Sequence, residues 1–196
     1  VAVMLLGGGG GGTSGTLTLE VTKDEWMKGN PDAKVTLVEY SDFQCPACRS
    51  REPLIKTLLG EFGNHMRFVY RHFPLRANHR NAQITAQASE AAGLQGKFWE
   101  MHGMIFENQQ IWEGQDTDQT EQTLIGYAEK LGLDMEKFKD DLTSSAVKSA
   151  VNNDADSGDD AGVNATPTFY LNGKKINPIN NDDFRSLLRQ AIESTP

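Results

Sequence analysis

Cys45 and Cys48 flank Pro46 and Ala47 and are the only cysteines in the 196-residue chain. An apolar, β-branched segment (34–40) ends just before them, and apolar residues at helical spacing follow, so we expect the pair at the start of a helix. At the N-cap, Cys45 would face backbone N–H groups without partners and the positive end of the helix dipole. Both features favour the thiolate and predict that Cys45 is an exposed nucleophile. One turn later, Cys48 could resolve a mixed disulfide by attacking Cys45.

Residues beside the cysteines complete the expected site. Pro46 removes one competing N–H group and fixes the turn, and Ala47 adds nothing polar. Arg49 and Arg51 add positive potential near the thiols. We expect Pro46, Ala47 and Phe43 to contact a substrate that approaches the pair.

Three other roles compete with redox chemistry. A zinc site would need two further ligands, and the spacings of the histidines are not those of a zinc finger. A structural disulfide across so short a loop would stabilise the fold little through chain entropy. Neither cysteine lies in an apolar periodic run, which argues against free core cysteines. The strand-to-helix context therefore favours a redox site without metal or cofactor. The histidines are His65, His72, His79 and His102.

Glu39 interrupts the apolar segment six positions before Cys45. A carboxyl group in a buried strand is costly unless it is paired or protonated. A raised pKa would let Glu39 pass protons to and from Cys48. The alternative is a solvated strand end paired with a lysine, but the clustering of perturbed carboxyls at active sites favours the functional role.

Thr166 and Pro167 directly precede a later strand candidate (168–171). A cis bond between them would present the N–H and C=O groups of Thr166 outward, where an extended substrate peptide could pair with them. An ordinary trans proline that opens a strand fits these residues equally well.

Two further groups carry weaker signals. His72, in Arg-His-Phe-Pro, could line the site and contact substrate, or simply cap a strand. The other three histidines are expected at the surface or in packing. Four aspartates do not have the spacing of an EF-hand, and we interpret them as a solvated helix end. They are Asp154, Asp156, Asp159 and Asp160.

The elements that position these residues follow from periodicity and turn signals. The sequence predicts a β-α-β unit, a long helical block and a β-β-α unit, with a hairpin turn at Asn172-Gly173. Pro53 is expected to kink the first helix. The strands are predicted at 34–40, 67–73, 168–171 and 174–176. The helices are predicted from Pro46 and at 79–94, 97–108, 118–131, 135–142, 144–161 and 182–192.

Composition excludes several classes of protein. Charged residues make up 23% and the net charge is −8, which argues against non-specific nucleic-acid binding. No run approaches 18 apolar residues, so no complete transmembrane helix is expected. Residues 1–6 read as the stump of a signal peptide or membrane anchor, or equally as a cloning artefact or flexible tail, followed by a disordered glycine-rich linker.

Three motifs together resemble the DsbA-like branch of the thioredoxin superfamily. They are Val-Glu-Tyr-Ser-Asp-Phe-Gln-Cys-Pro-Ala-Cys (38–48), Tyr-Arg-His-Phe-Pro-Leu (70–75) and Gly-Val-Asn-Ala-Thr-Pro-Thr-Phe (162–169). The resemblance covers about residues 26–193. It implies an α/β thioredoxin fold with an α-helical domain inserted between the second and third core strands. The implied division is a tail (1–18), a first thioredoxin part (19–77), the inserted helical domain (78–162) and a second thioredoxin part (163–196).

The same resemblance implies roles for four residues. Cys45 is the attacking cysteine, Cys48 the resolving one, Glu39 the buried carboxylate and Pro167 the cis proline that faces the disulfide. One departure concerns the residues between the cysteines, which are Pro-Ala here and Pro-His in strongly oxidising enterobacterial members. This leaves the strength of the pair as an oxidant open.

Together with the cysteine pair, the resemblance implies an extracytoplasmic thiol-disulfide oxidoreductase, in the periplasm or cell envelope, that introduces disulfides into secreted proteins. Its expected partners are reduced or unfolded secreted proteins and a quinone-linked membrane protein that reoxidises the pair. We expect a monomer, with a membrane anchor at the N-terminus if residues 1–6 are its remnant. The same chemistry run as a reductase or isomerase is the first alternative. A non-catalytic module that holds a metal through the cysteines is the second.

Overall fold

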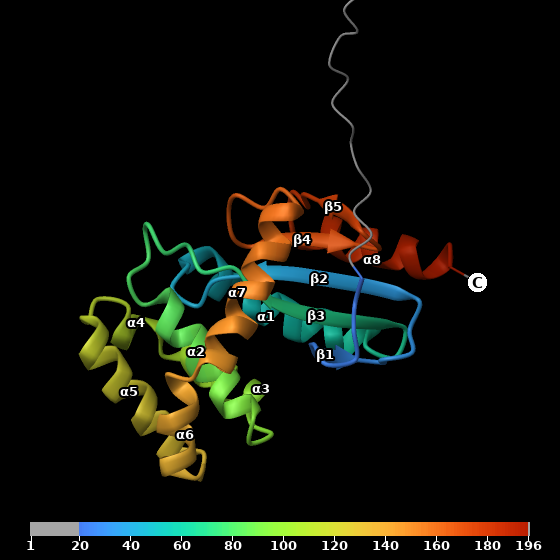
Figure 1. Cartoon of the computed structure of the whole chain (residues 1–196). Helices are drawn as coiled ribbons and strands as arrows, with labels where there is room; N and C mark the ends of the chain where they lie inside the picture. Colours follow the sequence, from blue (N-terminus) through green and yellow to red (C-terminus); the bar gives the residue numbers. More distant parts are fainter. Residues whose placement is uncertain (1–19, 196) are drawn as a thin grey trace, which may run out of the picture.

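The computed structural model describes residues 20–195, in which a five-stranded sheet lies between helices (Figure 1). The strand order is β1-β3-β2-β4-β5. Only β2 and β3 pair in parallel, and the other neighbouring pairs of this described sheet are antiparallel. The strands are β1 (Trp26–Gly29), β2 (Val35–Ser41), β3 (Met66–His72), β4 (Thr168–Leu171) and β5 (Lys174–Ile176).

The helices fall into two groups along the chain. Helix α1 connects the parallel strands β2 and β3, and α8 follows the β4–β5 hairpin. The other helices form a block between β3 and β4, most of which lies to one side of the sheet (Figure 1). The helices are α1 (Pro46–Phe62), α2 (Ala82–Gly93), α3 (Phe98–Glu107), α4 (Gln109–Trp112), α5 (Thr117–Lys130), α6 (Met135–Leu142), α7 (Ser145–Asp160) and α8 (Asn181–Glu193).

This architecture confirms the predicted fold class. The helical block separates the second and third of the strands predicted from sequence, and Asn172 and Gly173 form the hairpin turn with φ of 49° and 77°. Strand β1 and helix α4 were not predicted. Strand β1 has only four residues and pairs at the sheet edge, where Trp26 lies opposite Tyr70. The prediction for residues 1–18 lies outside the described residues.

The two faces of the sheet bury different side chains. Leu37 and Phe68 belong to the core on the α1 face, whereas Val38, Tyr40 and Val69 pack with residues of α7. Successive strand residues point to opposite faces. Because both faces are covered, every residue of β2 is buried, as expected for a central strand.

Helix α7 spans the helical block and the sheet. Val147, near its start, belongs to the core shared with the block, and Ala155 packs with the aromatic side chains on the sheet. A Cβ atom at Gly158 would lie 2.5 Å from Cδ2 of Phe73, so glycine permits close packing of α7 on the sheet. The Tyr40 hydroxyl and the Ser157 Oγ lie 2.9 Å apart in the same contact.

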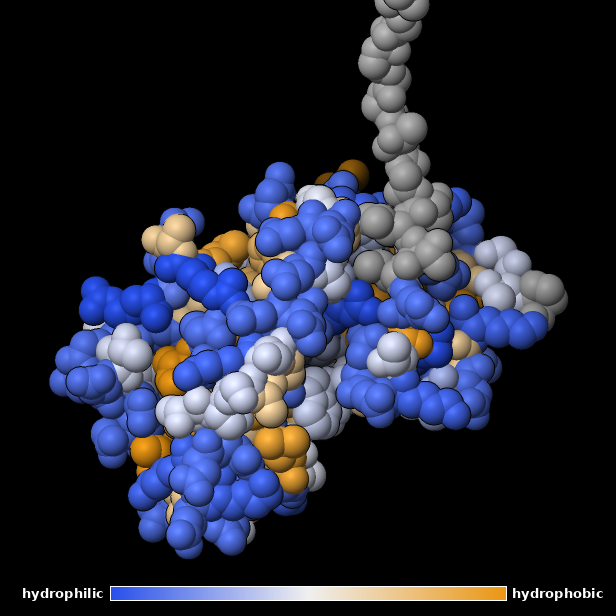
Figure 2. Space-filling model, viewed as in Figure 1, coloured by the Kyte–Doolittle hydropathy of each residue, from blue (hydrophilic) through white to orange (hydrophobic). Residues whose placement is uncertain are grey.

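Hydrophilic residues cover most of the face shown in Figure 2, and apolar residues form separate spots there. Among residues 20–195, the large apolar residues that are exposed are Leu94, Ile111 and Ile179. Within residues 20–195, no helix combines the length and apolar character needed to cross a membrane.

Candidate active site

Cys45 is the N-cap residue of α1, as predicted. Its backbone N–H donates to the Asp42 carbonyl, and its thiol donates to the Thr166 carbonyl at 3.3 Å. Hydrogen bonding from the Cys48 side chain lowers the pKa of Cys45 to about 5 against the opposing effect of burial, and the Thr166 side chain and the N–H groups of Ala47 and Cys48 add to this. The start of the helix therefore favours the Cys45 thiolate.

Cys48 has the opposite character. It is 1% exposed, and burial, followed by hydrogen bonding with Cys45 and the charge of Glu39, raises its pKa well above the ordinary value. The prediction that Cys45 is exposed is wrong, since Cys45 is only 7% exposed and lies against Thr166. It is nevertheless the more accessible thiol and the more easily ionised one.

Glu39 lies within the sheet beneath the cysteines. It is 1% exposed and lies between Tyr70 on β3 and Phe169 on β4 in the strand register. The alternative of a solvated strand end is therefore wrong. Burial, followed by the nearby charge of Glu52, raises the pKa of Glu39 to about 8. Glu39 is thus mostly protonated at neutral pH and able to give a proton to a neighbouring thiolate.

The segment before β4 completes the site. The Thr166–Pro167 peptide bond is cis, so the alternative of a trans proline is wrong. The Thr166 carbonyl is directed at the Cys45 thiol, whereas the sequence predicted that it faces outward. The structure thus brings residues of β2, α1 and this segment together although they are far apart in the chain.

Two predicted substrate contacts are wrong. Phe43 is 1% exposed and packs in an aromatic cluster, with ring centroids 4.7 Å from Phe106 and 5.6 Å from Tyr70. His72 is also 1% exposed. Neither side chain offers surface to a substrate, because the helical block covers them. Pro46 and Ala47 are exposed beside Cys45, and their contact with substrate stays a prediction.

His72 instead belongs to a buried polar cluster between β3, α2 and α7. Its Nε2 lies 3.1 Å from Oε1 of Glu90, and its backbone N–H donates to Oδ2 of Asp154 at 2.9 Å. Asp154 does not belong to a solvated helix end, because it lies within α7, is only partly exposed and accepts from His72, and burial raises its pKa to about 6. The other three aspartates of that predicted end are exposed.

The ligand atoms of His72, Glu90 and Asp154 all lie within 4.8 Å of one another, a spacing at which a metal ion could bind. Hydrogen bonds already engage them, since Glu90 also accepts from Trp26 Nε1 at 2.6 Å. These internal contacts account for the cluster, and we assign no metal to it.

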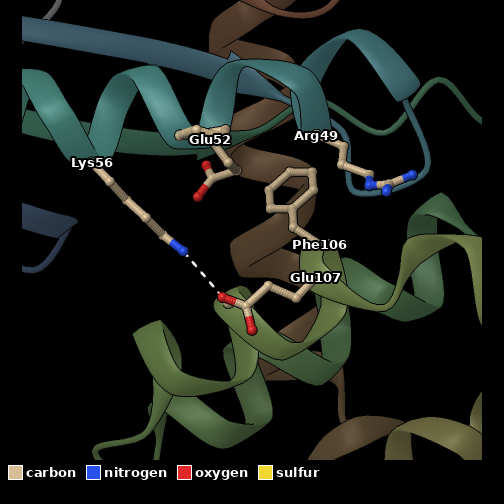
Figure 3. Close-up of a pocket in the computed structure, with 7 residues that line it drawn as sticks. Arg49, Glu52, Lys56, Phe106 and Glu107 are labelled. Carbon is tan, nitrogen blue, oxygen red and sulfur yellow. Dashed lines mark hydrogen bonds and ion pairs between the residues drawn. The ribbon is translucent and has the colours of Figure 1, made fainter.

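Glu52 is a functional candidate that sequence reasoning missed. It lines a cavity of about 200 Å³ between α1 and α3, and its carboxylate points into the space between the two helices (Figure 3). Burial raises the pKa of Glu52 to about 7, against the opposing charges of Lys56 and Lys28. Lys56 bonds Glu107 at 3.1 Å beside it (Figure 3). A signal was present, because Glu52 lies four residues after Cys48 and so on the same helix face.

Gln109 of α4 is a second residue that was missed. It is fully buried, and its Nε2 donates to the carbonyls of Phe43 at 2.6 Å and Cys45 at 3.1 Å. Gln109 thereby attaches the helical block to the backbone that carries the nucleophile. No sequence signal pointed to it, because the contact joins residues more than sixty positions apart.

Residues 21–190 match the family model described as thioredoxin. The chain belongs to the thioredoxin family. Its structural neighbours are DsbA-like thiol-disulfide oxidoreductases. Oxidised BdbD from Bacillus subtilis is 25% identical with a TM-score of 0.76, and the match covers 87% of this chain and 94% of BdbD. Alpha-DsbA1 from Wolbachia pipientis shares the fold, with 17% identity, a TM-score of 0.78 and coverage of 89% and 94%.

Curated relatives of this thioredoxin-family chain are named Na(+)/H(+) antiporter NhaA. NhaA 1 from Salinispora arenicola is 40% identical over 83% of this chain and 24% of the relative. NhaA 1 from Mycolicibacterium gilvum is 42% identical over 76% of this chain and 23% of the relative. The chain thus spans about a quarter of the length of these relatives.

Proposed function

We propose that this protein introduces disulfides into secreted proteins as an extracytoplasmic thiol-disulfide oxidoreductase. The observation that carries the proposal is the contrast between two thiols one helical turn apart. The pKa of Cys45 is lowered to about 5 by hydrogen bonding from Cys48, and the pKa of Cys48 is raised by burial. Such a contrast suits one sulfur to exchange with substrates and the other to close the internal disulfide.

The proposed reaction starts from the Cys45–Cys48 disulfide. A substrate thiolate attacks the Cys45 sulfur, a substrate–Cys45 disulfide forms, and Cys48 leaves as a thiolate that takes a proton from Glu39. A second substrate thiolate then attacks the substrate sulfur, which forms the substrate disulfide and releases Cys45 as a thiolate. Two electrons pass from the substrate dithiol to the cysteine pair.

The stabilised Cys45 thiolate supports the oxidase direction. A low pKa stabilises the reduced form, and a stabilised reduced form makes the pair a stronger oxidant. The absence of a histidine between the cysteines removes one source of thiolate stabilisation. The test must therefore distinguish the oxidase direction from the reductase or isomerase direction.

The DsbA-like neighbours support substrate proteins as partners, and the reoxidising partner is part of our proposal. The proposed partners are reduced secreted proteins as substrates and a quinone-linked membrane protein that reoxidises Cys45 and Cys48. Pro46, Ala47 and the Thr166–Pro167 segment would form the substrate-contacting rim of the site. We propose that the protein acts as a monomer.

The test is the equilibrium reduction potential of the cysteine pair, titrated against glutathione. A value near roughly −120 mV supports the oxidase, and a value near roughly −270 mV indicates a reductase fed by another electron donor. Cys45→Ser is expected to abolish exchange and leave the fold intact. Full exchange activity in Cys45→Ser would contradict the assignment of the nucleophile.

The antiporter relatives favour a second setting for the same chemistry, in which the redox domain acts beside a transport domain. In that setting the oxidation state of the cysteine pair would alter ion exchange. Na⁺/H⁺ exchange by the Salinispora arenicola relative in vesicles, compared before and after reduction with dithiothreitol, tests this. Equal rates in both states would exclude redox control of transport.

A further inference from the structure

Three buried oxygen atoms lie on the sheet face that α1 and Cys48 cover. Glu39 and Ser41 are two residues apart on β2, so their side chains point to the same face, and Tyr70 lies beside Glu39 in the parallel register of β3. Oε2 of Glu39, Oγ of Ser41 and the hydroxyl of Tyr70 are all buried. None of the three has a partner with the geometry of a formed hydrogen bond among the described residues.

Buried polar atoms normally pair, because an unpaired one carries its full desolvation cost. The Ser41 hydroxyl is placed to pair with more than one group. Burial is the largest cause of the raised pKa of Glu39, Cys48 and Tyr70, and the nearby Ser41 hydroxyl opposes this rise at all three, although it forms no hydrogen bond with any of them in this structure. A hydroxyl has one hydrogen that rotates, so Ser41 can serve these groups one at a time.

We propose that Ser41 is a positioning residue whose hydroxyl donates to whichever of Cys48 and Glu39 carries the negative charge during thiol-disulfide exchange. This rests on the proposed oxidoreductase function and deepens it. When Cys48 leaves as a thiolate, the Ser41 hydrogen points to its sulfur. After the Glu39 proton moves to that sulfur, the Ser41 hydrogen rotates to the Glu39 carboxylate. Attack by Cys48 on a mixed disulfide runs through the same positions in reverse.

Other charged groups also face Glu39 and contribute to any pH profile. Glu52, Cys45 and Arg51 act on it from α1, and Tyr70 lies beside it on β3. On β4 its neighbour is the uncharged Phe169. These groups are the same in the wild type and in the variants. The test therefore compares the pH midpoint of the reaction between these proteins and does not depend on its absolute value.

Reaction of the reduced protein with 5,5′-dithiobis(2-nitrobenzoic acid) separates the two thiols. The first release of thionitrobenzoate depends on reagent concentration and reports attack by Cys45. The second release is unimolecular and reports attack by Cys48 on the mixed disulfide. We expect Ser41→Ala to slow the second release roughly tenfold at pH 7, as for a lost hydrogen bond to a charged group, and to leave the first unchanged. The pH midpoint of the second release should rise by about one unit.

Three variants complete the design. Ser41→Thr keeps a hydroxyl and should restore most of the rate. Ser89→Ala is the matched control, because Ser89 is a buried serine of α2 whose Oγ donates to the Ala86 carbonyl. It should leave both releases unchanged. Ser41→Gly also removes the hydroxyl and gives the same test if Ser41→Ala does not fold.

Two results would overturn the proposal. One is a folded Ser41→Ala or Ser41→Gly with the wild-type rate and pH profile of the second release. The other is a folded Ser41→Thr that stays as slow as Ser41→Ala. Failure of the proposed function is distinguishable, because the wild-type protein itself would then lack the fast first release or the second release.

Discussion

At the scale of single residues, Glu39 couples stability to pH. Its pKa is raised to about 8, chiefly by burial, whereas an unfolded chain releases this proton near pH 4.5. Between these values the folded state holds a proton that the unfolded state has lost, so stability falls as pH rises. The slope for one such group is about 1.4 kcal/mol per pH unit.

We therefore predict that Glu39→Gln flattens the pH dependence of unfolding. The comparison uses the oxidised forms, in which Cys45 does not titrate, and urea unfolding at pH 5 and pH 8. The variant should lose less stability than the wild type between these pH values. Glu52 and Asp154, with pKa values raised by burial to about 7 and about 6, keep their part of the slope in both proteins. Equal slopes in wild type and variant would show that Glu39 does not hold its proton.

Gln109 gives a second prediction at this scale. Gln109→Ala leaves the carbonyls of Phe43 and Cys45 without their side-chain donor, so we expect a loss of about 1–3 kcal/mol of stability and a changed rate of thiol exchange at Cys45. Gln95→Ala is the matched control, because Gln95 makes two hydrogen bonds to the backbone of Asp134 within the helical block. It should lower stability in urea and leave the exchange rate unchanged. A Gln109→Ala protein with wild-type exchange would contradict the positioning role.

The sequence was sufficient for residues whose role is local. Cys45 and Cys48 form a helix-start pattern, and Glu39 stands out as a charge in an apolar strand. Gln109 was not predictable, because its partners come from another part of the chain. The predicted substrate contacts of Phe43 and His72 were wrong for a related reason. The helical block buries both side chains, and the residues next to them in the sequence do not indicate this burial.

At the scale of elements, the contact between α7 and the sheet depends on Gly158. Gly158→Ala would place a Cβ atom 2.5 Å from the Phe73 ring, so we predict a loss of about 1–3 kcal/mol of stability from overpacking. Gly126→Ala on α5 is the control, because a Cβ atom there meets nothing within 4 Å. It should stabilise the protein by up to about 1 kcal/mol. Urea denaturation measures both, and equal effects would mean that the α7 contact can adjust.

Elements with strong periodicity were predictable, and short ones were not. The α1 and α8 segments show apolar residues at helical spacing, and Asn172-Gly173 marks its turn. Strand β1 has only four residues, and its pairing with β3 holds it at the edge of the sheet. Helix α4 is a single turn. Such elements depend on tertiary contacts that local propensity does not encode.

At the scale of the whole molecule, the oxidation state of the cysteine pair should change stability. Hydrogen bonding from Cys48 lowers the pKa of Cys45 to about 5, whereas the ordinary value is 9.0. The unfolded reduced chain thus holds a proton that the folded one has lost between these values, so this stabilisation grows as pH rises and disappears as pH falls through about 5. The oxidised protein lacks the contribution.

We predict that the stability of the reduced protein, relative to the oxidised one, increases from pH 5 to pH 8. Urea midpoints of both forms at each pH measure it. Cys45→Ser is the control, because it removes the thiolate. Its stability should lack the rise with pH that the thiolate gives to the reduced wild type. A relative stability that falls with pH would argue against a stabilised thiolate and against the oxidase.

The position of Thr166 also has a consequence for synthesis on the ribosome. Thr166 lies against Cys45 and its side chain lowers the pKa of Cys45, yet it is translated well over one hundred residues after Cys48. Strand β2 and both thiols therefore leave the ribosome long before β4 can pair beside them. The nascent chain carries its sulfur atoms without the residue that helps to make Cys45 reactive. This thiol thus acquires its full reactivity only after Thr166 has been translated and β4 has paired with β2.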